Sequence, residues 1–87
     1  MATRFRPLHE VNVPFEKEFS LYGRDWRLGP AGGTNRWLVL PDGSTRDVAT
    51  IELDGDDWNV WSEALGDRHA FSPREAIETA IKGHLGS

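Results

Sequence analysis

The chain has 87 residues, a length that corresponds to one small domain. Its composition, with 38% hydrophobic and 28% charged residues, is typical of a folded globular protein and excludes a fully disordered chain. No apolar run is as long as the roughly 18 residues that a membrane-spanning helix needs. Residues 1–7 lack the apolar core of a secretory signal. We therefore expect a cytoplasmic protein. The absence of cysteine excludes disulfide scaffolds, cysteine-ligated zinc and thiol catalysis.

The net charge of −4 is unevenly distributed along the chain. Residues 1–9 hold Arg4 and Arg6 and no acid, whereas residues 10–87 hold 8 basic and 14 acidic residues, a net charge of −6. A body of that sign repels a phosphate backbone unless its arginines gather on one face. The charge therefore disfavours general nucleic-acid binding.

The N-terminal stretch contains Pro7 and Pro14, and no helical or strand periodicity of apolar residues holds there. We interpret residues 1–13 as an arm that is flexible or docks on the rest of the chain. Residues 14–87 then form a single small α+β domain.

Five segments carry the hydrophobic pattern of strands, with glycine- or proline-containing turns between them. The pattern predicts strands over residues 15–22, 26–28, 36–40, 48–53 and 58–63. A loop over 29–35 precedes the third strand, and the turns 41–44 and 54–57 close two hairpins. A further turn at 65–68 leads into residues 69–71.

Two independent signals predict a helix that begins after Ser72. Ser72 and Glu75 form a capping box, and Pro73 occupies the first helical position. Gly83 is the expected C-cap, and the apolar face consists of Ala76, Ile77, Ala80 and Ile81. The predicted fold class is α+β: an antiparallel meander of three to five strands with one C-terminal helix packed on one face.

Turn chemistry assigns side chains to the two faces of this sheet. If Leu40 lies opposite Thr45 and Leu53 opposite Trp58, the face beneath the helix collects Leu38, Leu40, Ala49, Ile51, Leu53, Trp58 and Val60. The second face then collects Trp37, Val39, Val48, Thr50 and Trp61. One helix covers only one face. Either residues 15–28 fold back over the second face and bury Phe19, Leu21 and Trp26 there, or its tryptophans form a binding platform.

Catalysis finds little support in the residue pattern. His69 beside Asp67 could form an orienting pair, but the nearby Ser72 is already explained as a helix cap. The acidic turn Asp54–Asp57 lacks the ligand spacing of a calcium loop, and the loop 29–35 lacks the Lys-Ser/Thr of a phosphate-binding loop. We expect no enzymatic activity, catalytic residue, metal, cofactor, small-molecule substrate or membrane partner.

The sequence instead favours a small non-catalytic binding module that acts through protein–protein contact. The contact would use the tryptophan-bearing sheet face or an edge strand, because tryptophan is enriched at interaction hot spots. The partner would be another protein or a second copy of the chain. The candidate binding residues are Arg36, Trp37, Val39, Arg46, Val48 and Trp61.

Two alternatives remain open from the sequence. The first is a sheet-based nucleic-acid-binding domain, in which the same tryptophans stack on bases while Arg36, Arg46 and the arginines of the arm contact phosphates. The second is an acidic DNA mimic or inhibitor, of the kind that phages and bacteria encode, in which carboxylates gathered near the turns grip a basic partner.

Overall fold

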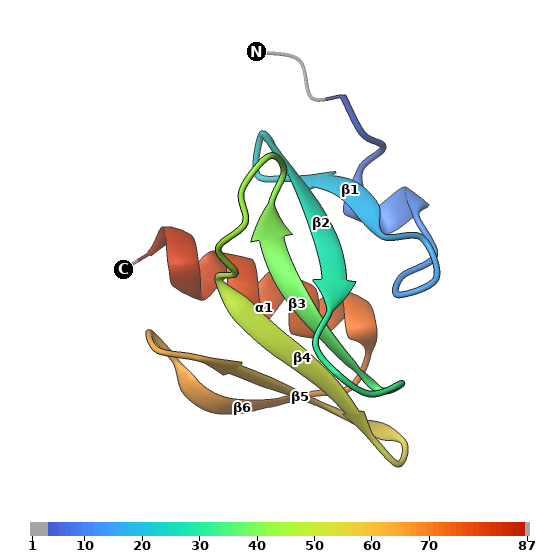
Figure 1. Cartoon of the computed structure of the whole chain (residues 1–87), viewed down its shortest axis with the longest axis vertical. Helices are drawn as coiled ribbons and strands as arrows, with labels where there is room; N and C mark the ends of the chain where they lie inside the picture. Colours follow the sequence, from blue (N-terminus) through green and yellow to red (C-terminus); the bar gives the residue numbers. More distant parts are fainter. Residues whose placement is uncertain (1–3, 87) are drawn as a thin grey trace.

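The computed structural model describes residues 4–86, which form one antiparallel sheet and a C-terminal helix (Figure 1). The sheet is a six-stranded meander in chain order, made of β1 (Glu18–Leu21), β2 (Arg24–Pro30), β3 (Arg36–Pro41), β4 (Ala49–Asp54), β5 (Asp57–Ser62) and β6 (Gly66–Ala70). The α+β architecture is confirmed, but the predicted number of strands was too low. The additional strand is β6, whose polar sequence carries no apolar alternation and therefore resembles a turn.

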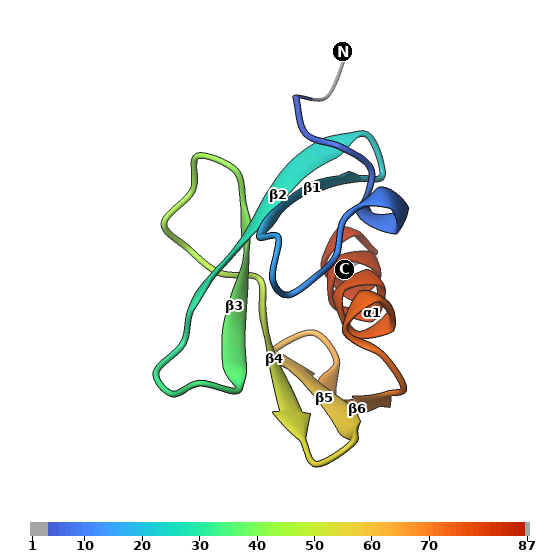
Figure 2. The same ribbon diagram turned by 90° about the vertical axis from the view of Figure 1, so that its right-hand side faces the viewer.

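Residues 4–13 pack on the same side of the sheet as the helix (Figure 2). A short 3-10 helix, η1 (Leu8–Glu10), lies in this segment, whose buried side chains are Leu8, Val11 and Val13. The amide of Ser20 in β1 donates to the Arg6 carbonyl over 2.8 Å. Met1, Ala2 and Thr3 of the predicted arm lie outside the described residues.

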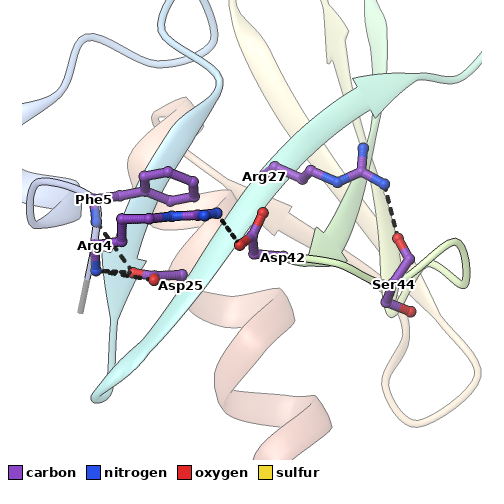
Figure 3. A network of polar contacts seen from close by, with 6 residues as sticks. All are labelled: Arg4, Phe5, Asp25, Arg27, Asp42 and Ser44. Atoms are coloured by element: carbon purple, nitrogen blue, oxygen red, sulfur yellow. Dashed lines mark hydrogen bonds and ion pairs between the residues drawn. The ribbon is translucent and has the colours of Figure 1, made fainter. Parts of the chain in front are cut away.

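The arm is also tied to β2 and to the chain after β3, as Figure 3 shows. The Arg4 amide donates to both carboxylate oxygens of Asp25, at 3.1 and 3.0 Å, and the Arg4 side chain pairs with Asp42. The Phe5 amide adds a contact to Asp25 at 3.3 Å. These contacts attach the arm to the neighbouring ends of β2 and β3, where the Asp42 amide donates to the Asp25 carbonyl at 3.1 Å.

The register between β3 and β4 differs from the one that the turn predicted. Trp37 was expected opposite Val48, but it pairs with Ile51, three residues further along. The 41–44 turn does form, with a 3.0 Å bond from the Ser44 amide to the Pro41 carbonyl. The chain then continues through residues 45–48 before β4 begins, so this turn does not close the hairpin. An odd shift moves the side chains of one strand to the opposite face.

Strands β1 and β2 extend the sheet beside β3 rather than folding over its second face. Phe19 pairs with Trp26, and both are fully buried in the core on the helix side. Of the two alternatives left open by the sequence, the one in which residues 15–28 cover the second face is therefore wrong. Phe15, expected in the first strand, precedes β1 and is exposed.

The helix α1 (Pro73–Leu85) confirms its predicted start and its predicted buried face. The Ser72 hydroxyl accepts a hydrogen bond from the Glu75 amide at 3.1 Å, and the buried positions are Ala76, Ile77, Ala80 and Ile81. The predicted C-cap was wrong, because Gly86 caps the helix. Gly83 lies inside α1 where a Cβ would come within 2.6 Å of the Leu65 side chain, so glycine permits the helix to approach the β5–β6 turn.

Candidate functional site

The sheet face opposite α1, here called the outer face, carries two cross-strand rows of side chains. Because directly paired residues point to the same side, one row runs through Gly29, Leu38, Thr50, Trp61 and Asp67. The neighbouring row runs through Arg36, Glu52, Asn59 and His69. The first row contains Leu38 and Trp61 on either side of Thr50 and ends at Asp67, and the second row is polar.

Trp61 is the tryptophan that the fold leaves accessible. Trp26 and Trp58 are buried, and Trp37 is half-buried with its ring centroid 5.5 Å from that of Trp58. Trp61 is 49% exposed, and it projects from the C-terminal half of β5 on the side that α1 does not cover. A half-exposed indole on a flat strand surface offers a large, rigid contact area for a partner.

The structure divides the six predicted binding residues between the two faces. Arg36 and Trp61 lie on the outer face, and Val48 lies near Trp61, just before β4. Arg46 lies in the loop over residues 42–48. The two residues on the helix side are Trp37 and Val39, and Val39 is fully buried. The predicted face composition was therefore wrong for β3 and correct for β5.

Leucines of β3 occupy the outer-face positions that were predicted for Trp37 and Val39. Leu38 is half-buried and joins the Trp61 row, while Leu40 is buried, with its Cδ1 atom 3.0 Å from where a Gly29 Cβ would stand. The length of the 42–48 loop, rather than its turn residues, was the signal that could have located these leucines. A seven-residue connection between strands does not fix the register through one local turn.

Two hollows flank Trp61. The larger, of about 770 Å³, lies between the 42–48 loop, the β5–β6 turn and the C-terminal end of α1, and is lined by Pro41, Ser44, Arg46, Asp47, Val48, Trp61, Glu63, Ala64 and His84. We call it the Trp61 groove. The smaller hollow, of about 330 Å³, lies over the strands and is lined by Arg36, Thr50, Glu52, Asn59, Val60, Trp61 and Asp67.

The charge around Trp61 is predominantly negative. The residues that line the two hollows beside Trp61 include four carboxylates, those of Asp47, Glu52, Glu63 and Asp67, and two arginines, Arg36 and Arg46. Asp67 pairs directly with Trp61 across β5 and β6. Arg36, the base on the outer face of β3, forms an ion pair with Glu52 at 2.8 Å. The outer face therefore attracts cationic groups.

The edges of the sheet are less suited to pairing with another chain. The β1 edge is engaged by the arm, through the Ser20 amide and the bridge between Ser20 and Pro7. The β6 edge is polar, and its exposed residues include Asp67, Arg68 and His69. Charged side chains on an edge strand oppose the addition of a further strand.

The residues considered for catalysis have other partners. The Ser72 hydroxyl caps α1, and His69 lies 3.3 Å from Asp57 and packs edge-on against Phe71. Asp67, the expected orienter, instead lies beside Trp61. Within residues 4–86, no group of three or more histidine or carboxylate side chains is placed to hold a metal ion.

Compared with known proteins, the chain matches no family model, no curated protein and no solved structure. Over the described part of the chain, the helix is too short and too polar to cross a membrane.

Proposed function

We propose that this protein is a non-catalytic binding module that docks on another protein through the outer face around Trp61. The observation that carries the proposal is the 49% exposure of Trp61 on a sheet face that α1 leaves uncovered. Tryptophan is enriched among the hot spots of protein interfaces. The partner surface combines apolar side chains with basic ones.

The arrangement around Trp61 resembles the layout of a protein interface. Leu38 and Thr50 continue the row of Trp61 on one side of the indole. The carboxylates of Asp67 and Glu63 lie on its other sides. An apolar centre gives affinity through burial, at about 25 cal/mol per Å² of apolar area. A charged border selects the partner and its orientation.

The nucleic-acid alternative receives less support from this geometry. Arg36 already pairs with Glu52, and Asp67 stands next to the indole on which a base would stack. Phosphates approaching this surface would meet four carboxylates against two arginines in the hollows beside Trp61. The acidic-mimic alternative shares the basic partner of our proposal, but it depends on carboxylates and has no use for Trp61.

Capture of partners by the immobilised chain, with quantitative mass spectrometry, tests the proposal. We expect a partner that is retained by the wild type and lost on Trp61→Ala, with binding weakened by about tenfold or more, as for a central tryptophan hot spot. Phe15→Ala is the matched control, because Phe15 is an 82% exposed aromatic outside the outer face. Equal capture by all three chains would contradict the proposal.

Two further measurements distinguish the proposed function from its alternatives. Binding that survives 0.5 M salt but requires Trp61 supports a protein partner, whereas binding to short DNA that falls steeply with salt supports nucleic acid. Loss of capture on Asp67→Asn with no effect of Trp61→Ala would favour the acidic mimic. Sedimentation of the wild type and Trp61→Ala shows whether the partner is a second copy of the chain.

A further inference from the structure

The Trp61 groove offers a bounded site at the border of the outer face, where the sheet meets the end of α1. Its walls come from three different parts of the chain: the 42–48 loop, the end of β5 with the turn after it, and the last turns of α1. Trp61 forms one wall and Glu63 and Asp47 contribute carboxylates. A cavity of about 770 Å³ is larger than one amino-acid side chain needs, so an incoming chain can enter it together with its backbone.

The loop wall of the groove is held in place by hydrogen bonds. The guanidinium of Arg27 donates to the Ser44 carbonyl over 2.7 Å, and the Arg4 side chain pairs with Asp42 (Figure 3). Within the loop, the Ser44 hydroxyl accepts from the Arg46 amide at 3.1 Å. A wall fixed before binding reduces the entropy lost when a ligand enters.

The groove carries carboxylates without cationic partners. Among residues 4–86, neither Asp47 nor Glu63 takes part in an ion pair or a side-chain hydrogen bond, whereas five other acids in this part of the chain form ion pairs with arginine or histidine. The C-terminal end of α1, at His84, adds the partial negative charge of a helix terminus. Arg46 and the imidazole of His84 are the basic side chains of the lining.

We propose that the Trp61 groove binds an arginine side chain of the partner protein. The guanidinium plane stacks on the indole of Trp61, and its N–H groups donate to the carboxylates of Glu63 and Asp47. The inference rests on the proposed function and specifies which partner group the outer face recognises.

Arginine fits this combination of groups better than lysine. A planar guanidinium can stack on an aromatic face and at the same time present a fork of donors to a carboxylate. The lysine ammonium is a compact and strongly hydrated charge, which gains less from a flat indole in an open groove. A phosphate or carboxylate ligand would face the acids Asp47 and Glu63, with Arg46 and His84 as the basic groups.

An NMR titration of the full chain with capped tripeptides tests the assignment. We would record ¹⁵N-HSQC spectra with capped Gly-Arg-Gly, Gly-Lys-Gly and Gly-citrulline-Gly, the last being a neutral isostere of arginine. We expect the Trp61 indole and the amides of Val48 and Ala64 to shift with the arginine peptide, to shift less with the lysine peptide and to stay fixed with citrulline.

Charge variants supply the matched controls. Glu63→Gln should weaken arginine binding by roughly three- to tenfold, the contribution of one exposed charge-assisted contact. Glu78→Gln removes the same charge from an exposed position of α1 outside the groove lining and should change nothing. Arg46→Gln should tighten arginine binding, whereas an anion site would lose affinity with the same change.

The outcomes separate the groove from the wider proposal. Shifts centred on Thr50 and Asn59 would place the peptide in the smaller hollow and overturn the groove assignment, while leaving the outer face as the interface. An equal response to lysine, or no shift with arginine, overturns the inference. Failure of the proposed function is instead recognised by partner capture that does not depend on Trp61.

Discussion

The two faces of the sheet use tryptophan in opposite ways. On the helix side, Trp26 and Trp58 fill space above small helix residues, since Ala76 and Ala80 let α1 approach the sheet closely. On the outer face, Trp61 is half-exposed, and its cross-strand neighbours are Thr50 and Asp67. The same residue type therefore stabilises the fold on one face and is available for binding on the other.

This difference shows why the tryptophan content alone is a poor guide to the binding site. A chain with four tryptophans suggests an aromatic platform, but a single helix with two alanines on its buried face needs large sheet residues to fill the core. Only the tryptophan that the core does not use remains as a candidate for function. Substitutions of tryptophans on the helix side should therefore reduce stability, whereas substitution of Trp61 on the outer face should reduce binding.

The largest effect is expected at the centre of the helix-side core. Trp26→Ala removes a fully buried indole whose Nε1 atom donates to the Leu21 carbonyl at 3.0 Å. We expect the free energy of unfolding to fall by about 3–5 kcal/mol. This is a large part of the total stability of a typical domain, which is roughly 5–15 kcal/mol. Urea unfolding followed by circular dichroism measures it. A loss below about 1 kcal/mol would contradict the core assignment.

The next effect concerns the close approach of α1 to the β5–β6 turn. Gly83→Ala should destabilise the protein by about 1–3 kcal/mol, because the new Cβ overlaps Leu65 and overpacking outweighs the better helix propensity of alanine. In a Leu65→Ala background the clash is absent, and the same change should stabilise by up to about 1 kcal/mol. The double-mutant cycle in urea gives both values. Stabilisation in the wild-type background would refute the packing argument.

A smaller effect is expected where the helix begins. Ser72→Ala removes the hydroxyl that accepts from the Glu75 amide at 3.1 Å, and should cost about 1 kcal/mol of stability. Ser72→Thr keeps an acceptor at the cap and should lose less. Thermal unfolding of the three proteins measures the difference, and equal midpoints would show that the cap adds nothing measurable to α1.

The smallest stability effect is expected on the outer face. Trp61→Thr replaces a half-exposed residue with another good strand former, so the free energy of unfolding should change by less than about 1 kcal/mol. The same variant should lose partner binding. Urea unfolding and the capture assay on one preparation measure both properties. A stability loss comparable to that of Trp26→Ala would remove the distinction between the two faces.

Local signals in the sequence determined the elements that end in short, well-defined motifs. The start of α1 and its buried face follow from the capping box and the apolar spacing. The β4–β5 register, with Leu53 opposite Trp58, follows from a two-residue loop whose Gly55 adopts a φ of +65°. For these elements, the residues that fix the geometry are neighbours along the chain.

The tertiary structure decided the features that depend on contacts between residues far apart in the sequence. The seven residues after β3 leave the β3–β4 register open, and an odd shift exchanges Leu38 and Leu40 with Trp37 and Val39 between the faces. The extension of α1 past Gly83 depends on clearance from Leu65. Trp61 was in the predicted site because the hairpin that holds it is local. The other residues of the groove are brought to it by the 42–48 loop and the end of α1, whose positions the packing of the whole chain sets.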